Sequence, residues 1–254
     1  MAQLVLPAKW LEQETPLSVQ RQWLSLDEHK RFQELHQHGD RLRMLAGRFV
    51  LRQCLREFYG LSQVRFSYGK TNKPFVAQPV EDKDAHAHPI DVNLTHDRQH
   101  VLAAFNTTGD VGVDVASLLD FTDWQEFAAD YLTADEVAWV RNARLAARPL
   151  RALRLWTLKE AVLKSTGHGL DIDPREIVLC PGSRFPIVAL PRHLPPVSVF
   201  GLHEWQIDTQ TYAALASVTA SSALSSGLNL PSASKLRFVE MSAKPLMPAH
   251  LRED

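Results

Sequence analysis

The 254-residue sequence is poor in cysteine, and its two cysteines, Cys54 and Cys180, lie far apart and are flanked by apolar or turn-forming residues. Few cysteines are typical of a reducing compartment, where thiols stay unpaired. No apolar run reaches the roughly 18 residues that suggest a membrane span, and the first ten residues show no small-residue cleavage site of a secretory signal. These absences predict a cytoplasmic protein without a membrane segment, in which both thiols are buried as small apolar groups.

An excess of charge of one sign is also missing, because 28 Lys and Arg residues stand against 29 Asp and Glu residues. General nucleic-acid binders usually carry a basic excess, so the sequence gives no support to that class, and any electropositive site must be local. The 45% hydrophobic content is ordinary for a globular protein. A chain of this length can bury a sizeable core without disulfides or structural metals.

Apolar residues at helical spacing predict helices over residues 25–59, 133–147 and 150–166. Asp40 is a plausible N-cap within the first segment, and Gly60 is its stop signal. The second segment begins with Thr133 and Glu136 at the spacing of a capping box. The third follows a proline that favours the first helical turn and precedes a glycine that favours the end of a helix.

Strands are predicted where apolar residues alternate with polar ones, at residues 90–94, 101–105, 111–115, 177–179, 187–190 and 212–218. Residues 107–110 have the composition of a hairpin turn. The polar stretch 81–89 is interpreted as a loop, because its His86 and His88 lack further ligands at zinc spacing. After about residue 219 the composition shifts to Ser, Ala, Pro and Leu, which predicts a partly disordered extension with a possible edge strand at 236–239.

Asp114 lies in the middle of the apolar strand 111–115, opposite in face to the three valines of that strand. An acid in this setting needs a partner, since an unpaired buried carboxylate is costly. Two interpretations remain open, which are a hydrogen-bonded or salt-bridged structural residue and an oxygen ligand for a hard cation such as Mg²⁺.

Glu160 lies in the segment WTLKEAVLK, which runs from Trp156 to Lys164. On a helix, Trp156, Glu160 and Leu163 lie on one face, so Glu160 is placed at the border of an apolar stripe. Lys164 follows it at i+4. A Glu–Lys surface pair is therefore the alternative to a functional acid.

In combination, GVDV at 112–115 and WTLKEAVLK at 156–164 resemble the 4′-phosphopantetheinyl transferase superfamily, and especially its two-lobed class that includes the surfactin-synthetase-activating type. NLTH at 93–96, the dipeptide Lys73-Pro74 and a first long helix with Arg43, Gly47 and Arg52 match further family motifs in order along the chain. The resemblance covers residues 25–218.

The resemblance implies an α+β fold of two similar α/β lobes with pseudo-twofold symmetry and the active site between them. We expect an N-terminal lobe over 1–110, a C-terminal lobe over 111–219 and an extension over 220–254. The implied activity is transfer of the 4′-phosphopantetheine moiety of coenzyme A to a serine of an apo acyl or peptidyl carrier protein, with release of 3′,5′-ADP. A catalytically impaired module that binds coenzyme A or the carrier is the alternative. A monomer is expected, and the carrier's pathway (fatty-acid, polyketide or nonribosomal peptide synthesis) stays open.

By the same resemblance, Asp114 and Glu160 would hold Mg²⁺ against the pyrophosphate of coenzyme A, with Glu136 as a further acid near the metal. Lys164 and His96 would neutralise charge on the phosphoryl oxygens, and Glu160 would accept the serine proton. Contacts with coenzyme A are implied for a larger set of residues, which are Arg31, Arg43, Lys73, Pro74, Thr95, His96, Lys159 and Lys164.

The sequence also departs from the family pattern. Ala116 stands where many relatives carry a second acid on the strand, and Asn72 stands where they carry glycine. A water can take the place of the missing acid, because Mg²⁺ retains waters readily.

Five arginines recur at spacings of three and four residues, which are Arg141, Arg144, Arg148, Arg151 and Arg154. This row is either a solvated basic face or a docking patch for an acidic carrier helix.

Overall fold

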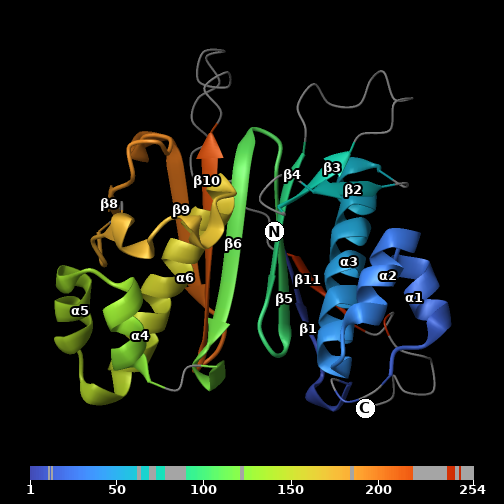
Figure 1. Ribbon diagram of the computed structural model, residues 1–254, viewed down its shortest axis with the longest axis horizontal. Coiled ribbons are helices and arrows are strands. Elements are labelled where there is room, and N and C mark those ends of the chain that lie inside the picture. The colour runs from blue at the N-terminus through green and yellow to red at the C-terminus, as the bar shows by residue number, and fades with distance from the viewer. Residues whose placement is uncertain are drawn as a thin grey trace.

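The computed structural model describes residues 1–10, 12, 14–61, 64–68, 73–77, 90–120, 123–183, 186–219, 239–243 and 246. The predicted loop at 81–89 with its two histidines, Asn72, and residues 236–238 of the predicted edge strand lie outside this range. The chain forms two sheets that face each other, each with a long helix on its outer side (Figure 1). The α+β class expected from the sequence is confirmed.

The N-terminal half is built on a six-stranded sheet with the order β11-β1-β5-β4-β3-β2. Its strands are β1 (Ala2–Val5), β2 (Arg65–Tyr68), β3 (Pro74–Ala77), β4 (Asp91–His96), β5 (His100–Asn106) and β11 (Val239–Met241). Its helices are α1 (Leu17–Trp23), α2 (Leu26–Glu34) and α3 (His38–Tyr59), and a 3₁₀ turn spans Ala8–Trp10.

The C-terminal half is built on a three-stranded sheet with the order β6-β10-β9 and a small β7–β8 pair. Its strands are β6 (Gly109–Ser117), β7 (Val178–Leu179), β8 (Ile187–Ala189), β9 (Phe200–Gln206) and β10 (Thr211–Thr219). Its helices are α4 (Trp124–Tyr131), α5 (Ala134–Arg141) and α6 (Arg148–Thr166). Short 3₁₀ turns lie at Leu118–Asp120, Leu145–Ala147, Gly169–Asp171, Pro174–Glu176 and Val197–Val199.

The first predicted helix is two helices. Ser25 caps α2 and forms a capping box with Glu28, and the chain then leaves the helical conformation at Leu35. Helix α3 begins at His38, so the prediction of Asp40 as its N-cap is wrong, and Asp40 instead lies in the first helical turn. Gly60 ends α3 as predicted, in the left-handed conformation with φ 71°.

The predicted helix over 133–147 is too long. The capping box of Thr133 and Glu136 forms, but α5 ends at Arg141 and a separate 3₁₀ turn covers 145–147. Asn142 closes α5 by donating its N–H to the carbonyl oxygen of Ala138, and the chain then turns into α6.

The two cysteines were both predicted to be buried. Cys54 is buried, but Cys180 is exposed, so the prediction is wrong for Cys180.

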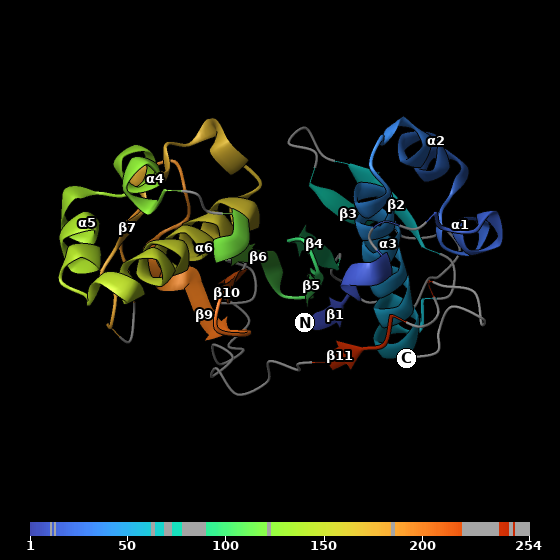
Figure 2. The same cartoon turned by 90° about the horizontal axis from the view of Figure 1, so that it is seen from below.

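The two faces of β4 serve different neighbours. Val92 belongs to the apolar core beneath α3, together with Val101 and Ala103 of β5. The opposite face, which carries the alternate residues of β4, looks toward the C-terminal sheet. There Leu102 of β5 joins Val113 of β6 in a second core between the two sheets. Strand β6 accordingly lies beside β4 and β5 in both views of the molecule (Figure 1, Figure 2).

The C-terminal extension returns to the N-terminal half. Strand β11 pairs in parallel with β1, with Ala2 opposite Val239 and Leu4 opposite Met241. Beyond it, Leu246 is fully buried in the N-terminal core. The edge strand thus forms at 239–241, and the described part of the extension belongs to the first sheet. No helix within the described ranges is long and apolar enough to cross a membrane.

Candidate active site

The site begins with three side chains that meet where the two sheets face each other. Lys164 of α6 donates to Oδ1 of Asp114 on β6 at 2.6 Å and to Oγ1 of Thr95 on β4 at 3.2 Å. Thr95 in turn donates to the same Oδ1 at 3.2 Å. Asp114 and Thr95 are buried, at 5% exposure each. The structure therefore brings together predicted residues from both halves of the chain.

Gly112 explains why α6 approaches β6 so closely. A Cβ atom at this position would lie 2.1 Å from the carbonyl oxygen of Ala161 and 2.3 Å from the amide nitrogen of Ser165. Both distances are far shorter than a contact between non-bonded atoms allows. The missing side chain lets the last turns of α6 cross β6 directly, and this crossing places Lys164 next to Asp114.

Glu160 lies one helical turn before Lys164 and is half-buried. Burial raises the pKa of its carboxyl from 4.5 to about 7, with Lys164 opposing the rise and Asp114 adding to it. Because the charges of both residues act on its carboxyl, Glu160 lies in the same electrostatic environment as the Asp114–Lys164 pair. A carboxyl with a pKa near neutrality can accept or release a proton at physiological pH.

Two carboxyl oxygens of this site are buried without a hydrogen-bond partner. They are Oδ2 of Asp114 and Oε1 of Glu160. Buried acid oxygens are normally hydrogen-bonded, because an unsatisfied one costs free energy. Two orphaned hard oxygen donors on acids that interact electrostatically fit a divalent cation such as Mg²⁺. Ala116, on the same face of β6 as Asp114, offers no third donor.

Glu136 and Lys159 contact each other rather than Asp114 or Lys164, and their predicted contacts with metal and coenzyme A stay a prediction. Their side chains are fully buried and form an ion pair at 2.7 Å. Lys159 also donates to the carbonyl oxygens of Tyr131 and Pro174, and Glu136 accepts the amide of Leu179. Burial lowers the pKa of Lys159, although Glu136 opposes this. The pair joins the helices of the C-terminal half from within.

Glu136 therefore does not complete a three-acid set with Asp114 and Glu160. Within the described ranges, no group of three or more His, Cys, Asp or Glu side chains is arranged to hold a metal ion. The fit to a cation rests on the two orphaned oxygens alone, with other coordination positions left to waters or to a ligand.

His96 follows Thr95 but points to the opposite side of β4. Its ring is exposed at a cavity of about 370 Å³ between α2, α3 and β4, which Arg31 and Arg48 also line. Removal from water lowers the pKa of His96 from 6.5, and the positive charges of Arg43 and then Lys164 lower it further. Leu35 and Met44 give the cavity an apolar part. The cavity is also lined by the acids Glu34 and Asp40, so it combines cations, acids and an apolar part.

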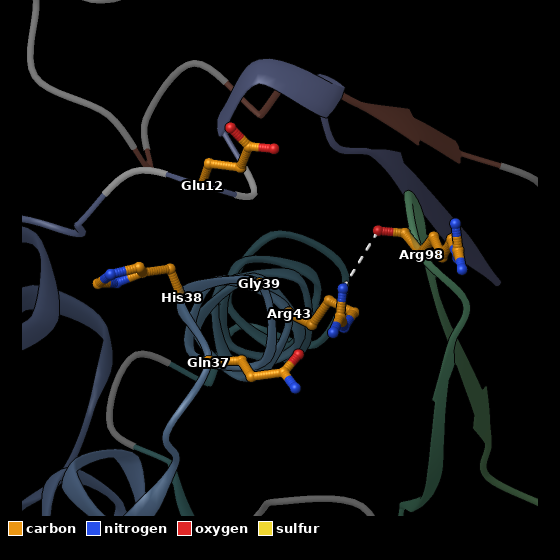
Figure 3. Close-up of a pocket in the computed structure, with 6 residues that line it drawn as sticks. All are labelled: Glu12, Gln37, His38, Gly39, Arg43 and Arg98. Carbon is orange, nitrogen blue, oxygen red and sulfur yellow. Dashed lines mark hydrogen bonds between the residues drawn. The ribbon is translucent and has the colours of Figure 1, made fainter.

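Arg43 lines a different cavity, although its partner Asp40 lines this one. Its guanidinium pairs with Asp40 and donates to the carbonyl oxygen of Arg98 at 3.4 Å. It lines a second, open cavity of about 500 Å³ at the start of α3, together with Glu12 and His38 (Figure 3). Arg43 and Arg31 therefore line different cavities, and their predicted contacts with coenzyme A stay a prediction.

Lys73 makes a contact that the sequence did not predict. Its Nζ donates to Oδ2 of Asp91 at 2.5 Å and to the carbonyl oxygen of Ser165 at 3.3 Å. Pro74 follows it at the start of β3. Lys73 thus joins the first sheet to the end of α6.

The arginine row is divided by its contacts. Arg154 pairs with Glu204 of β9, and Arg151 stacks over the ring of Trp139 at 4.3 Å. Arg141 and Arg144 are exposed. Arg148 donates to the carbonyl oxygen of Ala143. Since three of the five arginines are held by partners within the chain, the spacing alone did not define a continuous docking patch.

Two residues missed by the sequence reasoning lie next to the site. Asp91 and Asn93 alternate with Thr95 on the same face of β4, and both accept backbone N–H groups of β6. Polar residues at every second position of an otherwise apolar strand were the available signal.

The two halves of the chain match family models that describe the same kind of enzyme. A family model described as the 4′-phosphopantetheinyl transferase superfamily matches residues 110–213, and one described as the N-terminal part of 4′-phosphopantetheinyl transferase matches residues 8–108. The transferase HetI of a Nostoc species is 30% identical over 161 residues, which cover 62% of this chain and 66% of HetI. The transferase pptA of Paxillus involutus is 34% identical over 171 residues, covering 58% of this chain and 60% of pptA.

The chain therefore spans less than two thirds of the length of either relative. Among solved structures, a holo-(acyl-carrier-protein) synthase from Bacillus anthracis in complex with CoA (3′,5′-ADP) aligns with a TM-score of 0.38 and 17% identity. That alignment covers 44% of this chain and 96% of the synthase.

Proposed function

Because this chain belongs to the 4′-phosphopantetheinyl transferase superfamily, we propose that it transfers the phosphopantetheine arm of coenzyme A to a serine hydroxyl of an apo carrier protein and releases 3′,5′-ADP. The observation that carries the proposal is the pair of orphaned acid oxygens on Asp114 and Glu160 beside the ammonium of Lys164. This arrangement suits a diphosphate that is held by a cation and a lysine.

Asp114 and Glu160 would hold Mg²⁺, through Oδ2 and Oε1 respectively. When bound, the ion would neutralise negative charge on the diphosphate of coenzyme A. Lys164 would add a second positive charge, since its ammonium lies within hydrogen-bond reach of the same carboxylate. Thr95 fixes the position of that ammonium by accepting one of its protons.

The reaction requires a new bond between the serine oxygen and the β-phosphorus, and cleavage of the bond between that phosphorus and the oxygen that leaves with 3′,5′-ADP. Phosphoryl transfer of this kind depends mainly on positioning and on charge neutralisation. Glu160 would accept the serine proton, directly or through a water, as a carboxylate beside the proposed cation. Lys164 would stabilise the charge that develops on the phosphoryl oxygens.

We place the nucleotide end of coenzyme A in the cavity of about 370 Å³ beside β4. His96 and Arg31 would contact phosphate there, and the apolar part with Leu35 and Met44 would accept the adenine ring. Thr95 and His96 lie on opposite faces of one strand, so β4 would be the boundary between the diphosphate and the nucleotide cavity. Arg43, which lines the other cavity, would influence this site through charge on His96.

The direct experiment is incubation of the chain with coenzyme A, Mg²⁺ and apo carrier protein, followed by mass spectrometry of the carrier. A gain of one phosphopantetheine group supports transfer, and binding of coenzyme A without such a gain contradicts it. A catalytically impaired binding module is not favoured, because Asp114, Glu160 and Lys164 are all in place.

We further propose that the protein is a cytoplasmic monomer. The low cysteine content supports the compartment, and a site that both halves of one chain complete supports the monomer.

A further inference from the structure

Strand β6 lies at the edge of its sheet, since among the described strands β10 alone pairs with it, in the order β6-β10-β9. The backbone N–H groups on the free edge of such a strand need partners from elsewhere. The partners come from side chains of β4 in the other sheet. Asp91 accepts the N–H of Val111 at 2.7 Å, and Asn93 accepts the N–H of Val113 at 2.8 Å.

These contacts advance in step along both strands. Moving two residues along β4, from Asp91 to Asn93, moves the contact two residues along β6, from Val111 to Val113. The next alternate residue of β4 is Thr95, which donates to Asp114. The two structural contacts therefore lead directly into the candidate site.

Asp91 is also connected to helix α6. Its Oδ2 accepts a hydrogen bond from Lys73, whose Nζ donates in addition to the carbonyl oxygen of Ser165. Ser165 directly follows Lys164. One carboxylate thus holds β6 through Val111 and, through Lys73, the last turn of α6.

We propose that Asp91 and Asn93 are positioning residues, which fix the register of β4 against β6 and so set Thr95 opposite Asp114 and Lys164. A register shift of one residue would turn the apolar Val92 and Leu94 toward β6. A shift of two would remove Thr95 from Asp114. The catalytic consequence rests on the proposed transferase function, whereas the register itself does not.

The test uses Asn93→Leu, which removes the acceptor at similar volume, and Asp91→Asn, which keeps an acceptor oxygen for Val111. Asn106→Ala is the matched control, because the side chain of Asn106 bonds to Asp110 and Thr108 in the turn between β5 and β6 rather than to Val111 or Val113. Amide hydrogen exchange of the full chain is followed by NMR at Val111 and Val113, and kcat and KM for coenzyme A are measured in the transfer assay.

We expect Asn93→Leu to speed exchange at Val113 by about tenfold or more, which corresponds to about 1.4 kcal/mol. Its kcat should fall by about tenfold to hundredfold, as for a small misplacement of reacting groups, while KM for coenzyme A changes little. Asp91→Asn should retain slow exchange at Val111 and most of kcat. Asn106→Ala should match the unmodified chain in both measurements.

Unchanged exchange at Val113 in Asn93→Leu would overturn the proposal. So would faster exchange that extends equally to Leu45 in the core beneath α3, because Asn93 would then support only overall stability. An unchanged kcat despite faster exchange at Val113 would also overturn it. If the unmodified chain transfers nothing, the proposed function fails, and the exchange measurements still decide whether these side chains set the register.

Discussion

Lys164 neutralises one oxygen of Asp114 and leaves the other without a partner. Its Nζ lies 2.6 Å from Oδ1, whereas Oδ2 is buried and unsatisfied. A structural salt bridge at this depth would be expected to satisfy both oxygens. The asymmetry fits the proposed site, in which Oδ2 would bind a cation while Oδ1 binds the ammonium of Lys164.

The affinity for Mg²⁺ should depend on pH through Glu160. Because burial raises the pKa of its carboxyl to about 7, protonation is favoured in the metal-free folded state, and stability decreases as pH rises from 4.5 through 7. Mg²⁺ competes with this proton, so it should raise the melting temperature more at pH 8 than at pH 5.5. Differential scanning calorimetry with and without Mg²⁺ checks this. A Glu160→Gln variant that shows the same Mg²⁺ effect as the unmodified chain would refute the assignment.

Lys159 should matter for stability, unlike a lysine that contacts ligand from the surface. Lys159→Met leaves Glu136 as an unpaired charge in a fully buried position, and the loss of one partner of such a pair costs about 3–5 kcal/mol. Lys30→Met is the control, since Lys30 and Asp27 form an exposed pair at 76% and 92% exposure. Urea unfolding should show a change within about 0.5 kcal/mol for the control. Equal effects of the two substitutions would contradict the buried pair.

His100 should contribute more to stability when it is protonated than when it is neutral. Its ring lies 2.9 Å from Asp97, and this hydrogen bond raises the pKa of His100 from 6.5. The contribution is thus fully present below pH 6.5 and is lost as pH rises through the folded-state pKa. Relative to His100→Gln, the unmodified chain should gain about 1–2 kcal/mol at pH 6 and less at pH 9. A difference that grows with pH in chemical denaturation would have the wrong sign.

The C-terminal extension should stabilise the N-terminal half. Leu246 is fully buried in its core, so Leu246→Ala should cost about 2–5 kcal/mol through lost burial and the cavity that remains. Leu145→Ala provides the control, because Leu145 is 75% exposed. Thermal unfolding of both variants gives the comparison. A melting temperature for Leu246→Ala equal to that of the control would show that the extension does not pack as described.

The sequence predicted those parts of the site that depend on local pattern. Alternation in β4 to β6 and the helical periodicity of α6 placed Asp114 on a strand, and Glu160 and Lys164 one turn apart on a helix. The capping box of Thr133 and Glu136 was also local. The assignment of the site residues to coenzyme A and the cation went beyond pattern and remains a proposal.

What the sequence did not predict depends on which surfaces meet. Lys159 adjoins Glu160 in the chain, and only the packing of α4 and α5 on α6 buries it. Strand β9 was missed because its segment FGLHEWQ has no regular alternation. The pairing of β11 with β1 joins residues 237 positions apart, as Ala2 and Val239 do. The contact of Asn93 with Val113 required the relative position of two sheets.

The most direct measurement compares phosphopantetheine transfer by the unmodified chain and by Asp114→Asn, with Asp110→Asn as a control on the exposed end of the same strand. The amide keeps the shape of Asp114 but removes the charge that would hold the cation. The rate of carrier modification in excess Mg²⁺ should fall by about hundredfold or more for Asp114→Asn and stay unchanged for Asp110→Asn. Transfer by Asp114→Asn at the rate of the unmodified chain would contradict the account.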